Sequence, residues 1–156
     1  MKYEPTGPVH GKILVIDDNP IIQRAVHLMF RDRGYKVLMS GDIADALSVV
    51  RYEHPQLILI DVNFPGDHCL LEASDGFTAT EWFHQIPEAK GIPIIIISND
   101  SVEESEPKAL AAGAVAFLQK PFDTEKLFAL VKKYLPVRRP RLANSLGEAL
   151  KLVTTC

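Results

Sequence analysis

The sequence predicts an α/β fold: a doubly wound, five-stranded parallel sheet with helices on both faces. Five short apolar runs, mostly continuous rather than alternating, are typical of strands that are covered on both sides. Stretches with apolar residues at helical spacing separate these runs, and right-handed crossovers between parallel strands place such helices on both faces of a sheet. The apolar runs are residues 12–16, 35–40, 56–60, 92–98 and 114–119.

The first expected helix has a clear start and a clear stop. Asn19 is a suitable N-cap, and Pro20 fits the first helical position, where its missing N–H costs nothing. Gly34 suits the left-handed conformation that often ends a helix. The second and third helices are expected at 42–52 and 77–85, from the apolar stripes that these segments carry.

A proline complicates the fourth expected helix. Because Pro107 would interrupt a helix interior, we expect this helix to begin near 105–107 or to be irregular before that point. Gly113 is its expected stop. Two readings of such a shortened helix stay open. Pro107 is simply its N-terminal proline, or the helix is loosely held, which would make a conformational switch there easier. The fifth helix is expected over 123–135, with Asp123 as its N-cap.

Composition excludes several classes of protein. The chain has 156 residues, enough for one domain with its own core, and its net charge of −3 gives no general attraction to nucleic acid or to a membrane surface. No apolar run approaches the roughly 20 residues that cross a bilayer, and the N-terminus lacks the apolar stretch of a secretory signal. Cys69 and Cys156 have neither metal-like nor redox-like spacing. We therefore expect a reduced, cytoplasmic chain.

The two ends differ from the middle of the chain. Residues 1–10 contain prolines and a glycine and are expected to be a flexible lead-in, while residues 11–136 form the domain. Residues 137–156 are expected to be a basic linker followed by a short amphipathic helix, which is marginal alone and should dock on the domain, a second copy or a partner. The apolar side chains of that helix are Leu142, Leu146, Ala149, Leu150 and Val153.

Polar and charged residues follow four of the five apolar runs. Asp17 and Asp18 follow the first run, and Asp61 follows the third. Ser98 ends the fourth run, and Lys120 follows the fifth. Because parallel strands end on the same side of a sheet, and ligands bind outside those ends, we expect these side chains to converge there.

Three carboxylates in one small volume repel one another, and a divalent cation relieves that repulsion. A set of aspartates without histidine or cysteine at ligand spacing indicates Mg²⁺ rather than Zn²⁺. An aspartate is also an established nucleophile toward phosphoryl groups. In such a site Lys120 would balance charge on the phosphoryl oxygens, and the Ser98 hydroxyl would donate to one of them.

Four segments, ILVIDDNP, QLILIDVNFPG, PIIIISND and AAGAVAFLQKPF, together resemble the receiver domain of two-component response regulators. The resemblance covers about residues 11–136, and it implies either a stand-alone, chemotaxis-regulator-like receiver or a piece of a longer regulator. It implies a flavodoxin-like sheet with strand order 2-1-3-4-5.

By position in the resemblance, Asp61 matches the phosphoacceptor of the family. Asp17 and Asp18 match the acidic pair that holds Mg²⁺ together with the acceptor, and the backbone carbonyl of Asn63 matches a further protein ligand of the ion. These assignments are implied by the family pattern and not by spacing alone.

The remaining matches concern the response to phosphorylation. Ser98 matches the switch hydroxyl, Phe117 the rotating aromatic residue, and Lys120 the essential lysine. The bond between Lys120 and Pro121 matches a family position that is usually cis.

The resemblance implies a signalling module rather than an enzyme with its own substrate. A sensor histidine kinase or a histidine phosphotransfer protein would donate the phosphoryl group, and the domain itself would catalyse the transfer and the later hydrolysis. The face built from the fourth helix, the fifth strand and the fifth helix would then bind a downstream protein, with no direct contact to nucleic acid or membrane. A homodimer is left open.

Two departures from the family pattern stand out. The loop after the acceptor is about seven residues longer than usual, a change that costs little free energy at a surface. The extra residues, about 67–74, form a tolerated insertion, a gate or a partner contact; the adjacent residues Asp67, His68 and Cys69 cannot easily converge on a second metal ion. Asn99 replaces a small residue beside the phosphoryl pocket, and we expect an altered rate of dephosphorylation.

Two other classes of function remain as alternatives. Magnesium-dependent phosphatases that use an aspartyl intermediate need an Asp-x-Asp motif, whereas this chain has Asp-Asp-Asn at 17–19. A receiver-like interaction module that takes no phosphate would not need the complete set of site residues. Mass measurement after incubation with a small phosphodonor separates these alternatives.

Overall fold

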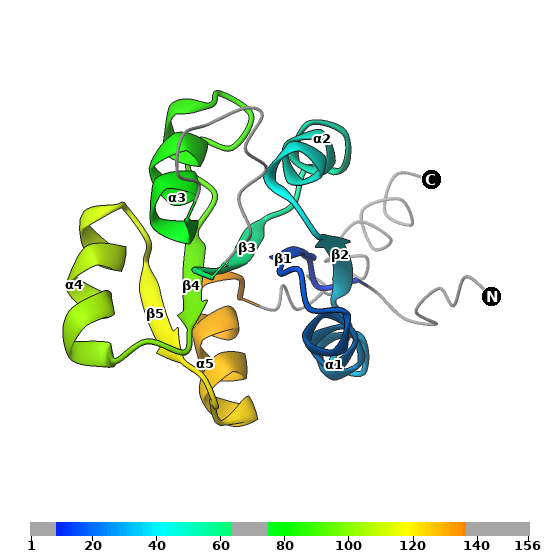
Figure 1. The fold of residues 1–156 in the computed structure, drawn as a ribbon. Helices are drawn as coiled ribbons and strands as arrows, with labels where there is room; N and C mark the ends of the chain where they lie inside the picture. Colours follow the sequence, from blue (N-terminus) through cyan, green and yellow to red (C-terminus); the bar gives the residue numbers. More distant parts are fainter. Residues whose placement is uncertain (1–8, 64–74, 137–156) are drawn as a thin grey trace, which may run out of the picture.

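The computed structural model describes residues 9–63 and 75–136. Within them, five parallel strands form one sheet in the order β2-β1-β3-β4-β5, as expected, and helices cover both faces (Figure 1). The elements are β1 Lys12–Ile16, α1 Pro20–Arg31, β2 Lys36–Ser40, α2 Ile43–Glu53, β3 Leu57–Asp61, α3 Gly76–Gln85, β4 Ile94–Ser98, α4 Val102–Ala111, β5 Ala116–Gln119 and α5 Thr124–Tyr134.

The central strands explain why their sequences are continuously apolar. Every residue of β3 and of β4 is buried, because each strand has a neighbour on either side and helices on both faces. The edge strand β2 instead has only two buried residues, Val37 and Ser40, among its five. The continuous apolar runs of β3 and β4 are thus explained by burial on both faces of the sheet.

Alternate residues of each strand supply two separate cores. Ile13 and Val15 of β1 lie in the core under α1 and α5, whereas Leu14 and Ile16 lie in the core on the opposite face, under α2, α3 and α4. Each fully buried aliphatic side chain of this size contributes roughly 1.5–3 kcal/mol of transfer free energy. The sheet is therefore packed on both faces, and its carboxyl edge holds the residues that follow the strands in fixed relative positions.

The helix ends follow the signals in the sequence. The Asn19 side chain accepts a hydrogen bond from the Ile21 N–H at 2.9 Å, and Asp123 accepts one from the Glu125 N–H at 2.8 Å. Gly113 follows α4 in the left-handed region, with φ of 98°. These caps satisfy backbone groups that a helix terminus leaves without partners.

The prediction for the fourth helix was wrong at its start. Helix α4 begins at Val102, so Pro107 lies inside it rather than at its first turn. The Ser105 N–H already closes the first turn on the Ser101 carbonyl at 3.1 Å, and two glutamates in that turn favour the positive end of the helix dipole. The helix therefore runs for ten residues although Pro107 has no N–H to donate.

Several expectations concern residues outside the described ranges, namely most of the 1–10 lead-in, the 67–74 insertion and the 137–156 tail. His10, at the end of the lead-in, is held: its N–H donates to the Gly34 carbonyl at 2.8 Å, and its ring contacts that of Tyr35. Among residues 9–63 and 75–136, no helix is both long and apolar enough to span a membrane.

Candidate functional site

Three carboxylates meet at the carboxyl edge of the sheet. Asp17 and Asp18 follow β1, Asp61 ends the neighbouring strand β3, and one oxygen from each lies within 4.8 Å of the others. Asp17 is only 3% exposed and Asp61 only 6%, whereas Asp18 is exposed. The cluster is therefore a cup with a buried floor and an open side.

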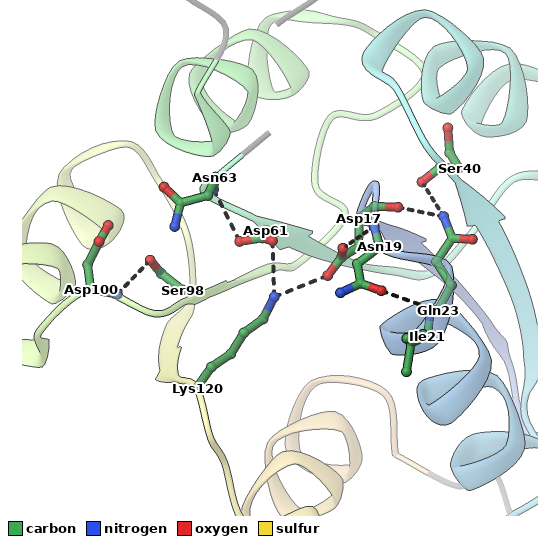
Figure 2. Close-up of polar contacts among 10 residues, drawn as sticks. All are labelled: Asp17, Asn19, Ile21, Gln23, Ser40, Asp61, Asn63, Ser98, Asp100 and Lys120. Carbon is green, nitrogen blue, oxygen red and sulfur yellow. Dashed lines mark hydrogen bonds and ion pairs between the residues drawn. The ribbon is translucent and has the colours of Figure 1, made fainter. Parts of the chain in front are cut away.

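A lysine that is distant in sequence, Lys120, contacts the carboxylates of this cup. The Nζ atom of Lys120, which follows β5, lies 3.0 Å from Oδ2 of Asp61 and 3.2 Å from Oδ2 of Asp17. Figure 2 shows this ammonium bridging the two carboxylates. The sheet topology thus brings together side chains that are 59 and 103 positions apart in sequence.

The charges of the cup are only partly balanced. Burial raises the pKa of the Asp17 carboxyl above its ordinary value of 3.8, despite the opposing effects of the Asn19 N–H and of Lys120. Burial alone would lower the pKa of Lys120, but the hydrogen bonds and charges of Asp61 and Asp17 raise it. Lys120 is therefore charged at neutral pH, while burial makes ionisation of the Asp17 carboxyl less favourable than in water.

Three of the site residues, Asp17, Asp61 and Ser98, are each oriented by a turn of the same kind. Asp17 Oδ1 accepts from the Asn19 N–H at 2.8 Å, and Asp61 Oδ1 accepts from the Asn63 N–H at 3.1 Å. Aspartate and serine side chains commonly bind the backbone two residues later at the start of a turn. These bonds fix where each side chain points as its strand ends. The third such bond runs from the Asp100 N–H to Ser98 Oγ, at 3.0 Å.

Ser98 and Phe117 lie where the sequence placed them. Ser98 is fully buried at the end of β4, next to β3, whose Asp61 pairs with Ile97 in the sheet register. A serine hydroxyl that accepts one hydrogen bond keeps its own hydrogen to donate. Phe117 in β5 is 8% exposed and packs in the core that contains α3 and α4, so its ring already lies inward here.

Two further expectations concern the same region. The Lys120–Pro121 peptide bond is cis, as the resemblance implied. Asn63 lies two residues after Asp61 and is exposed. Its N–H donates to the Asp61 carboxylate, and the role of its carbonyl as a metal ligand stays a prediction.

Two residues at the site were missed by reasoning from sequence. Gly76, the first residue of α3, lies so close to β3 that an added Cβ would be 2.5 Å from the Asp61 carbonyl oxygen. Gln23 of α1 donates from Nε2 to the Asp17 carbonyl oxygen at 2.5 Å. The Asp-Gly pair at 75–76 was a possible signal for the first, whereas nothing in the sequence distinguishes Gln23 from other helix-surface residues.

The donor set of the cup suits a hard divalent cation. Its ligands are carboxylate oxygens, two of them buried, and Mg²⁺ prefers oxygen ligands with one or two carboxylates and several waters. Asp18 is exposed, so the cup is open to solvent on that side. The residues present therefore fit Mg²⁺.

Comparison with known proteins gives a consistent result. The family model for the response regulator receiver domain matches residues 13–132. PilH of Pseudomonas aeruginosa is 29% identical over 125 residues, which are 80% of this chain and 98% of PilH.

Two solved structures are similar over the same region. The chemotaxis protein CheY4 of Vibrio cholerae is 27% identical, with a TM-score of 0.70 over 80% of this chain and 98% of that one. The receiver domain of a sensor histidine kinase from Pseudomonas aeruginosa, crystallised with a magnesium ion in its active-site cleft, is 26% identical, with a TM-score of 0.68 over 80% and 97% of the two chains. With this fold and these matches, the chain belongs to the response regulator receiver domain family.

Proposed function

We propose that Asp61 accepts a phosphoryl group from a phosphohistidine on a sensor kinase or a histidine phosphotransfer protein, in a reaction that needs Mg²⁺. The observation that carries this proposal is the position of the Asp61 carboxylate, held between the Lys120 ammonium and a second buried carboxylate, Asp17. Membership in the receiver family supports it, because this family acts in two-component signalling.

The transfer is a substitution at phosphorus. A carboxylate oxygen of Asp61 attacks, the bond from phosphorus to the histidine nitrogen breaks, and the nitrogen leaves with the electron pair. The product is an acyl phosphate. It is hydrolysed when a water attacks the same phosphorus and the Asp61 carboxylate leaves. The domain therefore catalyses its own modification and its reversal, and does not turn over a separate substrate.

The chain's own residues supply positioning and charge for these steps. Asp17, Asp18, Asp61 and the Asn63 carbonyl would hold Mg²⁺, which when bound offsets negative charge on the carboxylates and on phosphoryl oxygens. The solved kinase receiver with magnesium in its cleft supports this assignment. Lys120, freed from one of its two carboxylate contacts, would bind a phosphoryl oxygen.

The same modification would operate a switch. A phosphoryl group on Asp61 offers new acceptors to the Ser98 hydroxyl, and movement of Ser98 changes the space beside Phe117. Helix α4 packs closely on β5, so a change there reaches the surface formed by α4, β5 and α5. Two apolar side chains of α4 are exposed on the described surface, Val102 at 38% and Leu110 at 51%, which suits a protein partner.

The cellular setting follows from the donor. Sensor kinases present their phosphohistidine in the cytoplasm, so we place the chain there. A direct contact with nucleic acid has no support in the net charge of −3.

One experiment tests the proposed acceptor. The protein is incubated with Mg²⁺ and acetyl phosphate and its intact mass is measured. We expect the mass of one phosphoryl group to be added to the wild type and to Asp42→Asn, a matched control at the start of α2, but not to Asp61→Asn. A wild type that gains no mass would contradict the proposal and favour a phosphate-independent interaction module.

A further inference from the structure

Helix α1 contributes a side chain to the cup that the proposed chemistry does not use. The Nε2 atom of Gln23 donates to two backbone carbonyls, that of Asp17 at 2.5 Å and that of Ser40 at 3.1 Å (Figure 2). Only the nitrogen of the amide can face two carbonyl oxygens, so this orientation of the side chain is fixed by its partners.

These two carbonyls belong to the ends of neighbouring strands. Asp17 is the first residue after β1, and Ser40 is the last residue of β2. The Asp17 N–H also donates to the Ser40 carbonyl at 3.1 Å, so the β1–β2 pairing is extended by one residue beyond Ile16. Gln23 adds to this extension, because its side chain joins the Asp17 carbonyl to the Ser40 carbonyl that already accepts from the Asp17 N–H.

The hydrogen bond from Gln23 controls a peptide unit inside the cup. The Asp17 carbonyl belongs to the peptide that joins Asp17 to Asp18, the two adjacent carboxylates. Without a partner for that carbonyl, repulsion between the carboxylates favours rotation of the peptide and separation of the side chains. The amide of Gln23 is neutral, so it holds the peptide without adding a positive charge that would compete with a bound cation.

We infer that Gln23 is a positioning residue for the metal cup, which it keeps in the arrangement that binds a divalent cation. This inference rests on the proposed Mg²⁺ site. Removal of partners that orient metal ligands typically costs about 10- to 100-fold in metal affinity, and we expect an effect of this size.

The test compares two glutamines that bind backbone at opposite edges of the sheet. Gln23→Met keeps the length of the side chain but removes the donor. Gln56→Met is the matched control, because Gln56 accepts from the Lys12 N–H at 3.1 Å at the start of β1, far from the cup along that strand. We expect calorimetric titration with Mg²⁺ to give a dissociation constant raised about 10- to 100-fold for Gln23→Met and changed less than about twofold for Gln56→Met.

Urea unfolding in the presence of EDTA separates affinity from general stability. The inference is wrong if Gln23→Met binds Mg²⁺ as the wild type does, or if Gln56→Met loses as much affinity. A wild type that binds no Mg²⁺ would instead contradict the proposed function itself, so the two failures are distinguishable.

A measurement on the wild type covers the case in which Gln23→Met does not fold. By NMR, the side-chain amide protons of Gln23 should exchange slowly with solvent and shift on addition of Mg²⁺, while those of Gln56 should do neither. Fast exchange and an unchanged shift for Gln23 would overturn the inference.

Discussion

Replacement of Asp17 by asparagine should stabilise the metal-free protein while it weakens the metal site. Asp17 is 3% exposed, and its burial raises the pKa of its carboxyl group. Asparagine has the same shape and keeps an oxygen that accepts from the Asn19 N–H. The substitution therefore removes a charge without removing the turn at the end of β1.

The size of the effect follows from the distances. At an effective dielectric constant of about 20, two like charges at 4.8 Å repel by about 3.5 kcal/mol, and Asp17 has two such neighbours. Its attraction to Lys120 at 3.2 Å is about 5 kcal/mol on the same scale. Repulsion and desolvation together exceed this attraction, but Asp18 is exposed and its repulsion is screened. We expect a net gain of about 1 kcal/mol, or roughly 4 °C in Tm.

The pH dependence independently gives the sign of the change in unfolding free energy. Because the pKa of Asp17 is higher in the folded state than its ordinary value of 3.8, the folded protein binds this proton more tightly than the unfolded chain does. The wild type therefore loses stability as pH rises from 3.8 through the folded pKa, and Asp17→Asn does not. The advantage of the variant should be absent in acid and should grow as pH rises through the folded pKa of Asp17.

The assay is urea unfolding at neutral pH in EDTA and again in Mg²⁺. In EDTA the variant should be the more stable protein. In Mg²⁺ the wild type should gain about 2.7 kcal/mol at 100 times its dissociation constant, and the variant much less. A variant that is less stable than the wild type in EDTA would refute the electrostatic reasoning.

Three further substitutions test other parts of the site. Lys120→Met should slow phosphorylation by acetyl phosphate by about 100-fold or more while Mg²⁺ still binds, as measured by intact mass over time and by calorimetry. Gly76→Ala should cost about 1–3 kcal/mol of unfolding free energy in urea, because its Cβ would lie 2.5 Å from the Asp61 carbonyl oxygen. Gly41→Ala is its control, since an added Cβ there meets nothing within 4 Å, and an equal loss would contradict the steric argument. Asn99→Ala should change the lifetime of the phosphoryl group, timed by loss of the added mass; an unchanged lifetime would remove any role for this amide.

The fold was predictable because its signals are local and repeated. Continuous apolar runs identified the buried strands, and single capping residues such as Asn19 and Asp123 marked helix starts. The start of α4 was not predictable from Pro107 alone. Pro107 removes one helical hydrogen bond, yet the turn before it still forms, because the Ser105 N–H binds the Ser101 carbonyl.

The site was predictable where topology alone brings residues together. Asp17, Asp61 and Lys120 follow parallel strands, so their convergence needed only the order of the strands. The contributions of Gln23 and Gly76 were not predictable in the same way. Both act on backbone atoms at distances that depend on how a helix packs against the sheet, and a residue's type does not report that packing.

The most direct test is a crystal structure of the protein grown with Mg²⁺ and beryllofluoride, an analogue of the phosphoryl group. The account predicts beryllium bonded to the Asp61 carboxylate, Lys120 against a fluorine atom, and Mg²⁺ in the cup with Asp17 and the Asn63 carbonyl among its ligands. A structure from such crystals in which Asp61 is unmodified and the cup holds no ion would contradict the central claim.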